Sequence, residues 1–309
     1  MELSLSWVLS LRDVLVSSLQ SRRLPLPLDR DVCEGWRTGL PSGGGTRALY
    51  TSCMYQMAPA MQKAVESLEK LGAARGGIRS KLAAVGAKTA GGLLLRPGKE
   101  ELERAYKILR NIYEILRRSG VEFRLLDGEP YSGALLYELG FEEEFAEYAK
   151  EVYRYFKEKG VEEVITVDPH THYVLEKIYP SYVEDFDLEV VSYLDLLDAG
   201  KVKVKTSGFT IHDSCLYARF LDKYQRIRQL LAPGNPTEDP YITGKETAGC
   251  CGGPVESIAP NLATKIAVDR AKRLSKLSDS VVVVCPICLV NLSKTNITKV
   301  YHMSEVLGF

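Results

Sequence analysis

Seven cysteines occur in the 309-residue sequence, and five of them lie in its last third. These five are Cys215, the adjacent pair Cys250 and Cys251, and the C-P-I-C pair Cys285 and Cys288. Thiolates are soft ligands that select iron–sulfur clusters or zinc over hard ions such as magnesium. Four thiolates satisfy tetrahedral zinc or an ordinary cubane cluster, so the fifth thiol favours an iron–sulfur site over structural zinc.

The residues beside these cysteines suit a bulky cofactor. Gly252 and Gly253 directly follow the cysteine pair, and glycine allows close backbone approach and a positive φ. Pro286 stiffens the loop between the last two cysteines. The C-x-x-C spacing of Cys285 and Cys288 also allows direct thiol–disulfide chemistry, because such spacing can lower a thiol pKa. That alternative leaves the other three cysteines without a role.

Alternating strand and helix patterns predict an α/β protein with mainly parallel sheets. In the first half the strands are RALYTS, VEFRLL, EEVITVD and DLEVVSY, and helices are expected over about 99–119 and 142–160. In the second half a strand in KTSGFTIHDSC precedes one helix over LYARFLDKYQRIRQLL, and a buried strand runs into the last cysteine loop. Parallel strands end at one sheet edge, where ligands bind, so the cysteine loops are expected to meet there.

The second half resembles a copy of the first. LYTSC aligns with IHDSC, Tyr131-Ser132-Gly133 with Cys250-Cys251-Gly252, and VITVDPHTH with VVVVCPICL. The stretches LPLPLDRD and TGLPSGGGT read as a linker rich in proline and glycine. We therefore predict an N-terminal helix and linker over 1–46, a degenerate module over 47–204 and an intact module with a metal site at its loop ends over 205–309.

These motifs, above all AGCCGGP and CPIC, resemble the cysteine-rich CCG-domain proteins, typified by the B subunit of heterodisulfide reductase and the corresponding part of its D subunit. The resemblance covers roughly residues 45–309 and extends to iron–sulfur subunits of glycerol-3-phosphate and lactate oxidation systems. It implies two tandem modules, one of which holds a non-cubane [4Fe-4S] cluster through five cysteines and cleaves a disulfide. It further implies that the ligands here are Cys215, Cys250, Cys251, Cys285 and Cys288.

The first module departs from the family pattern. It keeps Cys53 alone, because Tyr131 and Ser132 replace the cysteine pair, and Asp168 and Thr171 stand where the C-P-x-C cysteines would lie. A cluster is not expected in this module. The resemblance implies that disulfide chemistry uses two such clusters together, so heterodisulfide reduction by this chain alone is not expected. We expect the iron–sulfur redox subunit of a heterodisulfide-reductase-like complex, in which one [4Fe-4S] cluster transfers electrons or reduces a disulfide or similar small substrate.

Three further residues carry weaker signals. His212, three residues before the first site cysteine, is placed either to donate a hydrogen bond to a cluster sulfur or simply to pack at a strand end. Cys53 aligns with a ligand position, and without partners it is expected to be a buried thiol. Cys33 falls in the predicted linker and is expected to be inert.

His170 and His172 lie in the motif D-P-H-T-H after a predicted strand. Together with Cys53 they are candidates for a mixed zinc site in the first module. The alternative is a helix that Asp168 caps and that Pro169 begins, with both histidines on its surface.

Composition excludes several functional classes. The 40 basic residues balance the 40 acidic ones, so no net positive field would attract nucleic acid. No apolar run reaches the about 18 residues that cross a bilayer, and the opening segment, which lacks a basic start and a cleavage site, reads as a mature helix. The cysteine cluster is typical of a reducing compartment, which predicts a cytoplasmic protein.

Longer members of the family carry C-x-x-C-x-x-C-x-x-x-C-P ferredoxin motifs, and this sequence has none. Electrons are therefore expected from ferredoxin-like or flavin-containing subunits of a complex. An apolar face of the first helix is a candidate surface for docking a partner subunit; it comprises Leu5, Trp7, Val8, Leu11 and Leu15. Any membrane association is expected to be peripheral and to run through such a partner. The competing function is a non-catalytic, zinc-binding assembly or scaffold subunit.

Overall fold

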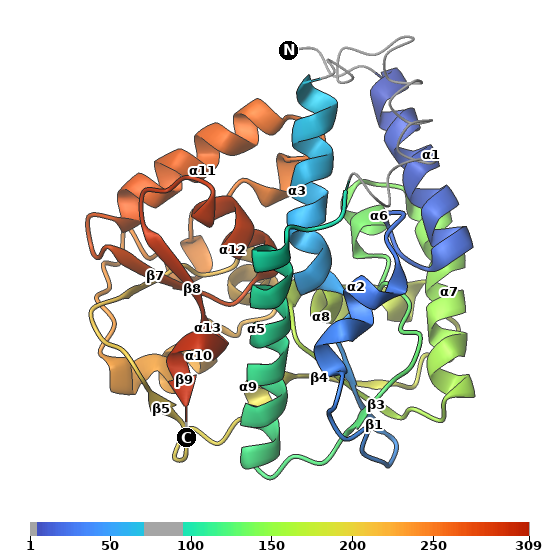
Figure 1. Ribbon diagram of the computed structural model, residues 1–309, viewed down its shortest axis with the longest axis horizontal. Coiled ribbons are helices and arrows are strands. Elements are labelled where there is room, and N and C mark those ends of the chain that lie inside the picture. Colours follow the sequence, from blue (N-terminus) through green and yellow to red (C-terminus); the bar gives the residue numbers. More distant parts are fainter. Residues whose placement is uncertain (1–4, 71–94, 309) are drawn as a thin grey trace.

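Two parallel sheets form the framework of the chain (Figure 1), which confirms the predicted α/β class. The computed structural model describes residues 5–70 and 95–308, and it describes side chains in 8–65 and 95–308. The first sheet has the parallel order β2 (Arg124–Leu125), β1 (Arg47–Tyr50), β3 (Glu163–Thr166) and β4 (Glu189–Ser192). The second has the parallel order β6 (Thr210–Ile211), β7 (Ser280–Val283) and β8 (Lys299–His302). An antiparallel pair joins β5 (Lys203–Val204) to β9 (Leu307–Gly308).

Helices surround the two sheets, and α3 and α5 run between the two halves of the molecule (Figure 1). The α-helices are α1 (Leu5–Arg22), α2 (Arg30–Glu34), α3 (Met54–Lys70), α5 (Lys99–Arg118), α6 (Ala134–Glu138), α7 (Glu142–Glu158), α8 (Pro169–Tyr173), α9 (Tyr193–Leu196), α10 (Tyr224–Leu231), α11 (Pro260–Leu274), α12 (Pro286–Ser293) and α13 (Met303–Val306). The shorter 3₁₀ and π turns are η1 (Gly35–Arg37), η3 (Val174–Ile178), η4 (Tyr179–Ser181), η5 (Leu216–Phe220), η6 (Ala232–Gly234), η7 (Lys245–Thr247) and η8 (Gly253–Val255).

The first sheet is buried on both faces. Successive residues of a strand point to opposite sides, so Ala48 and Tyr50 of β1 enter one hydrophobic core while Leu49 enters the other. The core around Leu49 continues into the second sheet, where it includes Val281 and Val283. The two halves therefore share one core.

The two halves repeat the same connections, which supports the predicted duplication. The order β1, β3, β4 corresponds to β6, β7, β8. Gly133 and Gly252 both begin a helical turn with positive φ, at 79° and 89°. Asp168 and Cys285 both cap a helix that starts with proline. These equivalences match the alignment made from the sequence.

A pair of tyrosines ties each half to an edge strand of the other half's parallel sheet. The hydroxyl of Tyr55, from the first half, lies 2.7 Å from His302 Nε2 at the end of β8. The hydroxyl of Tyr217, from the second half, lies 3.3 Å from Ser192 Oγ at the end of β4. The two contacts are equivalent in the repeat, so the halves are joined with approximate two-fold symmetry.

The segment expected to be a linker is part of the packed body. Leu24, Leu28 and Trp36 are buried, and the segment contains α2 and η1. Its prolines and glycines form turns, and the apolar residues between them are buried in the core. The boundaries of the three predicted segments otherwise remain a prediction.

The predicted helix after Cys215 is broken in two. The π turn η5 and helix α10 are separated near Asp222, which has a φ of 49°. The apolar periodicity across this stretch does not reveal the break, because both pieces bury residues such as Tyr217 and Ile227 in the same core.

The apolar face of α1 packs largely against its own chain. Leu15 and Leu19 are buried, and Val8 and Leu11 pack against the same core. This contradicts the expectation that Leu11 and Leu15 offer a docking surface. The side chains of Leu5 and Trp7, named with them, fall outside the described residues.

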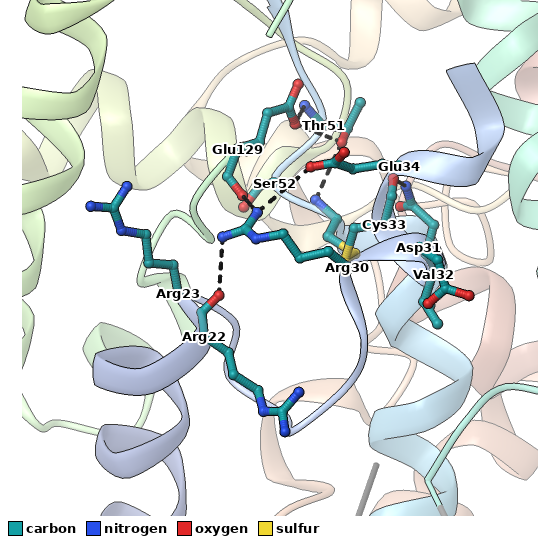
Figure 2. Close-up of a disulfide and its surroundings, with 12 residues drawn as sticks. Arg22, Arg23, Arg30, Asp31, Val32, Cys33, Glu34, Thr51, Ser52 and Glu129 are labelled. Carbon is teal, nitrogen blue, oxygen red and sulfur yellow. Dashed lines mark hydrogen bonds and ion pairs between the residues drawn. A yellow bond between two sulfur atoms is a disulfide. The ribbon is translucent and has the colours of Figure 1, made fainter. Parts of the chain in front are cut away.

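Cys33 and Cys53 form a disulfide (Figure 2), which corrects the expectation of an inert thiol and a buried free thiol. Their Cα atoms lie 5.1 Å apart across a sequence separation of 20. The bond ties α2 to the loop after β1, where Cys53 has a φ of 56°. Pairing of this kind depends on tertiary contact and cannot be read from spacing alone.

We predict that replacing both cysteines, Cys33→Ser with Cys53→Ser, lowers the free energy of unfolding by about 3 kcal/mol, because the unfolded chain regains the entropy of a closed loop. Denaturant titration under oxidising conditions measures this loss. Wild-type protein treated with reductant is the control and should lose a similar amount. An unchanged unfolding midpoint in both samples would contradict the disulfide.

Glu129 is half-buried beside the disulfide loop (Figure 2). Thr51 donates to its Oε2 from its backbone nitrogen at 3.0 Å and from its hydroxyl at 2.9 Å. Burial raises the pKa of Glu129 to about 7, despite these hydrogen bonds. The folded chain therefore keeps the Glu129 proton in a pH range where the unfolded chain has already released it.

Stability should fall as pH rises from about 4.5 to about 7, because the folded chain binds the Glu129 proton more tightly than the unfolded chain does. We predict that Glu129→Gln removes this component. The variant should gain stability over wild type by at most about 1.4 kcal/mol for each pH unit across that range. Unfolding measured at several pH values tests this, and a difference that does not change with pH would contradict it.

Candidate metal centre

The structure brings together the five cysteines predicted as ligands. Cys215 follows β6, Cys250 and Cys251 precede η8, and Cys285 and Cys288 occupy the start of α12. The sulfurs of Cys251 and Cys288 lie 3.3 Å apart. Cys215 interacts electrostatically with Cys251 and Cys285, and Cys250 with Cys251. Three loops that are distant in sequence therefore form one cluster of thiols.

Glycine is required where the cysteine pair turns into η8. A Cβ on Gly252 would lie 2.4 Å from the carbonyl oxygen of Ala263. A Cβ on Gly253 would lie 2.3 Å from Ile287 Cγ2 and 3.5 Å from Cys251 Sγ. Distances this short leave no room for a side chain, so the two glycines let the loop close against α11 and α12.

The thiols differ in exposure and in pKa. Cys251, Cys285 and Cys288 are buried, whereas Cys215 and Cys250 are half-buried. Burial opposes ionisation of Cys285, but hydrogen bonds from Cys288 and His170 outweigh it and lower the pKa of Cys285 to about 6. Burial and neighbouring thiols raise the pKa of Cys215 to about 11. Without a cation, the thiols at this site cannot all be ionised together.

His212 faces the thiols from the end of β6. Its Nδ1 accepts a hydrogen bond from Arg270 Nε at 3.1 Å. Because a guanidinium can only donate, the neutral imidazole must carry its proton on Nε2. His212, Cys251 and Cys288 have ligand atoms within 4.8 Å of one another. This position favours the expected hydrogen bond to sulfur over simple packing at a strand end.

Arg270, on α11, is a buried residue that sequence reasoning missed. Besides His212, it donates to the carbonyl oxygens of Ile242 and Thr243, which lie in the segment before the cysteine pair. The available signal is its position: Arg270 falls on the helix face that also carries Ala263, Ala267 and Leu274, where an apolar residue is expected.

Asp213 joins two of the cysteine loops. Its carboxylate accepts from Arg228 at 2.9 and 2.8 Å and from the backbone nitrogen of Lys245 at 3.1 Å. Arg219 donates to the carbonyl oxygen of Ala248. Arg219 directly, and Arg228 through Asp213, therefore hold the loop before Cys250 in place.

Among the described residues, His170 of the first half reaches the site. His170, on α8, places its Nε2 3.4 Å from Cys285 Sγ and its Nδ1 2.5 Å from Glu138 Oε1. Burial disfavours the charged imidazole, but Glu138 and Cys285 outweigh it and raise the pKa of His170 well above its usual value. Sequence reasoning placed His170 in the first module and missed this contact across the halves.

The mixed zinc site expected from Cys53, His170 and His172 is not formed by these side chains. Cys53 is bonded to Cys33, and His170 faces Cys285. His172 is buried and lies 2.8 Å from Thr166 Oγ1 through its Nδ1. The predicted helix cap is confirmed, because Asp168 accepts hydrogen bonds from the backbone nitrogens of two residues in α8. The two histidines, however, are buried and do not lie on the surface of the helix.

Oxygen replaces sulfur at the equivalent place in the first half. The hydroxyls of Ser132 and Thr171 lie 3.5 Å apart, as the sulfurs of Cys251 and Cys288 do at 3.3 Å. Tyr131, which aligns with Cys250, is buried. The first half thus keeps the backbone arrangement of the cysteine site but has hydroxyl groups where the second half has thiols.

Comparison with known proteins agrees with this duplication. Residues 99–176 and 209–293 each match the cysteine-rich (CCG) domain. The chain is 29% identical over 202 residues, 61% of its length, to a probable iron–sulfur-binding oxidoreductase, FadF, of Bacillus subtilis. It is 26% identical over 230 residues, 66% of its length, to an EtfAB:quinone oxidoreductase of Syntrophomonas wolfei.

A probable membrane-anchored ferredoxin of Chromohalobacter salexigens is 27% identical over 162 residues, 48% of this chain. The matched regions cover 28%, 32% and 24% of the FadF, quinone oxidoreductase and ferredoxin proteins, so the chain spans only a part of each. The similarity therefore concerns a part of each of these longer proteins. On the two domain matches and the repeated fold, the chain belongs to the cysteine-rich CCG-domain family.

Proposed function

We propose that Cys215, Cys250, Cys251, Cys285 and Cys288 bind one [4Fe-4S] cluster of the non-cubane type, and that the chain is the redox part of an oxidoreductase complex. The observation that carries this proposal is the convergence of five thiols at one site, where Cys251 contacts Cys288 and the other three interact with this pair. When bound, such a cluster accepts and donates single electrons. The names of the relatives, an iron–sulfur-binding oxidoreductase and an EtfAB:quinone oxidoreductase, support the same class of function.

The residues around the thiols suit such a cluster. Gly252 and Gly253 leave the backbone free to approach it, and they pack closely against α11 and α12, respectively. His212 is positioned to donate from Nε2 to Cys251, and His170 contacts Cys285, so two imidazoles would help to hold negative charge on sulfur. The half-buried Cys215 and Cys250 would lie on the side that an electron donor can approach.

We propose that electrons pass to or from ferredoxin-like or flavin-containing subunits in the cytoplasm, and that the acceptor is a disulfide or a similar small substrate. None of the described helices has the length and apolarity that crossing a bilayer requires. Association with a membrane would then run through a partner subunit.

A second candidate is a zinc-binding scaffold. It is favoured by one observation, the close approach of His212, Cys251 and Cys288, which is a suitable set of zinc ligands. Direct thiol–disulfide chemistry by Cys285 is less well supported. Its pKa is lowered to about 6, but the side chain is almost fully buried, so a protein or thiol substrate would not reach it.

We predict about four irons and four acid-labile sulfides per chain in anaerobically purified wild-type protein. Cys288→Ser, which introduces the kind of oxygen ligand found in the first half, should lose both. The matched control is Cys33→Ser with Cys53→Ser, which removes two cysteines elsewhere and should keep iron and sulfide. One zinc per chain without sulfide would support the scaffold and defeat the redox function.

We also predict that His212 raises the reduction potential of the bound cluster. A hydrogen bond to a charged group contributes about 1.5 kcal/mol. Its loss in His212→Leu should therefore lower the midpoint potential by about 60 mV. His212→Gln, which retains a donor, should recover part of the shift in a redox titration. Arg273→Gln, on the exposed side of α11, is the control, and equal potentials in all four proteins would contradict this role.

A further inference from the structure

A cavity of about 90 Å³ lies beside the thiol site, between α1, α3, α6 and α12. Most of its wall is apolar and includes Leu15, Met54, Ala58, Leu135 and Val290. Several of these side chains also belong to the hydrophobic core of the first half. The cavity therefore offers a small apolar space at the junction between the halves.

The wall of the cavity includes residues that lie next to the thiols. His170 forms part of its wall, and the Nε2 of His170 lies 3.4 Å from Cys285 Sγ. Gly253 forms another part, and a Cβ at that position would lie 3.5 Å from Cys251 Sγ. A molecule in the cavity would be separated from the site by an imidazole ring on one side and by no side chain at all on the other.

Asn291 lines the same cavity and is fully buried. Within the part of the chain that the structure describes, neither its Nδ2 nor its Oδ1 has a hydrogen-bond partner. Buried amides are nearly always hydrogen-bonded, so this side chain is complementary to a ligand. Because the amide has both a donor and an acceptor, its best complement is a group that also donates and accepts, such as a hydroxyl.

The charges around the cavity disfavour an anion. Its described wall contains the carboxylates of Glu138 and Glu256 and neither lysine nor arginine. Glu138 is held by His170, and Glu256 by Lys294 at 2.5 Å, from outside the wall. Without a free cation to pair with it, a sulfonate, phosphate or carboxylate would lose its hydration uncompensated.

We propose that this cavity binds a neutral molecule of the phenol or quinol class, with its ring among the apolar side chains and its hydroxyl on the amide of Asn291. The volume limits the enclosed part to about one ring. The inference rests on the proposed function only in placing the ligand beside a redox centre. The cavity, its unpartnered amide and its charges are independent of which metal the thiols hold.

The probe is 4-methylphenol, added to anaerobically purified protein and followed by equilibrium dialysis. Toluene lacks the hydroxyl and 4-methylbenzenesulfonate carries a charge, so these two compounds separate the contributions of ring, hydroxyl and charge. We expect 4-methylphenol to bind most tightly, toluene about tenfold more weakly because it lacks one hydrogen bond, and the sulfonate not at all. Iron and sulfide are measured on the same samples, so an iron-free protein that binds the phenol defeats the proposed function and supports the cavity.

Asn291→Leu should weaken binding of 4-methylphenol by about tenfold and leave binding of toluene unchanged. Ala58→Phe should abolish binding of both by filling the space, and Leu135→Phe replaces it if that variant does not fold. Gln229→Leu, an exposed polar-to-leucine change on α10, is the matched control and should bind as wild type does. Absence of phenol binding, equal binding by Asn291→Leu, or preference for the sulfonate would overturn the proposal.

Discussion

Thiols brought into mutual contact repel one another when ionised, and this constraint governs the whole structure. Cys251 and Cys288 lie 3.3 Å apart, and Cys215, Cys250 and Cys285 interact with them electrostatically. A bound cation would remove this repulsion, because its positive charge offsets the negative charges of the thiolates that coordinate it. The surrounding fold serves this arrangement: Gly252 and Gly253 leave space, and Arg270 orients His212 toward the sulfurs.

The duplication separates the fold of the site from its chemistry. Ser132 and Thr171 occupy the positions of Cys251 and Cys288 at nearly the same separation, yet their hydroxyls are weak ligands for soft metals. The first half has instead become a support for the second. It supplies His170 to Cys285, and its α3 packs against α12, which contains Cys288 and begins directly after Cys285. One functional centre therefore depends on both halves.

Sequence patterns predicted those features that depend on local chemistry. The helix Lys99–Arg118 and the strand Glu163–Thr166 lie within the predicted ranges, and the aligned glycines and cysteines occupy equivalent positions. The features that were missed depend on contacts between distant segments. The Cys33–Cys53 bond, the proximity of His170 to Cys285 and the contact of Arg270 with His212 each join residues that neither spacing nor periodicity can relate. Arg270 at an apolar helix position was the one detectable signal.

The central claim is that one half of the molecule holds an iron–sulfur cluster and the other half does not. Mössbauer spectroscopy of anaerobically purified, ⁵⁷Fe-enriched wild-type protein tests it most directly, because it reports the ligation and the number of iron environments together. The account predicts that all bound iron belongs to a single sulfur-ligated cluster, with about four irons per chain. Iron in two clusters, or a spectrum without protein-bound iron from a sample that contains stoichiometric zinc, would contradict it.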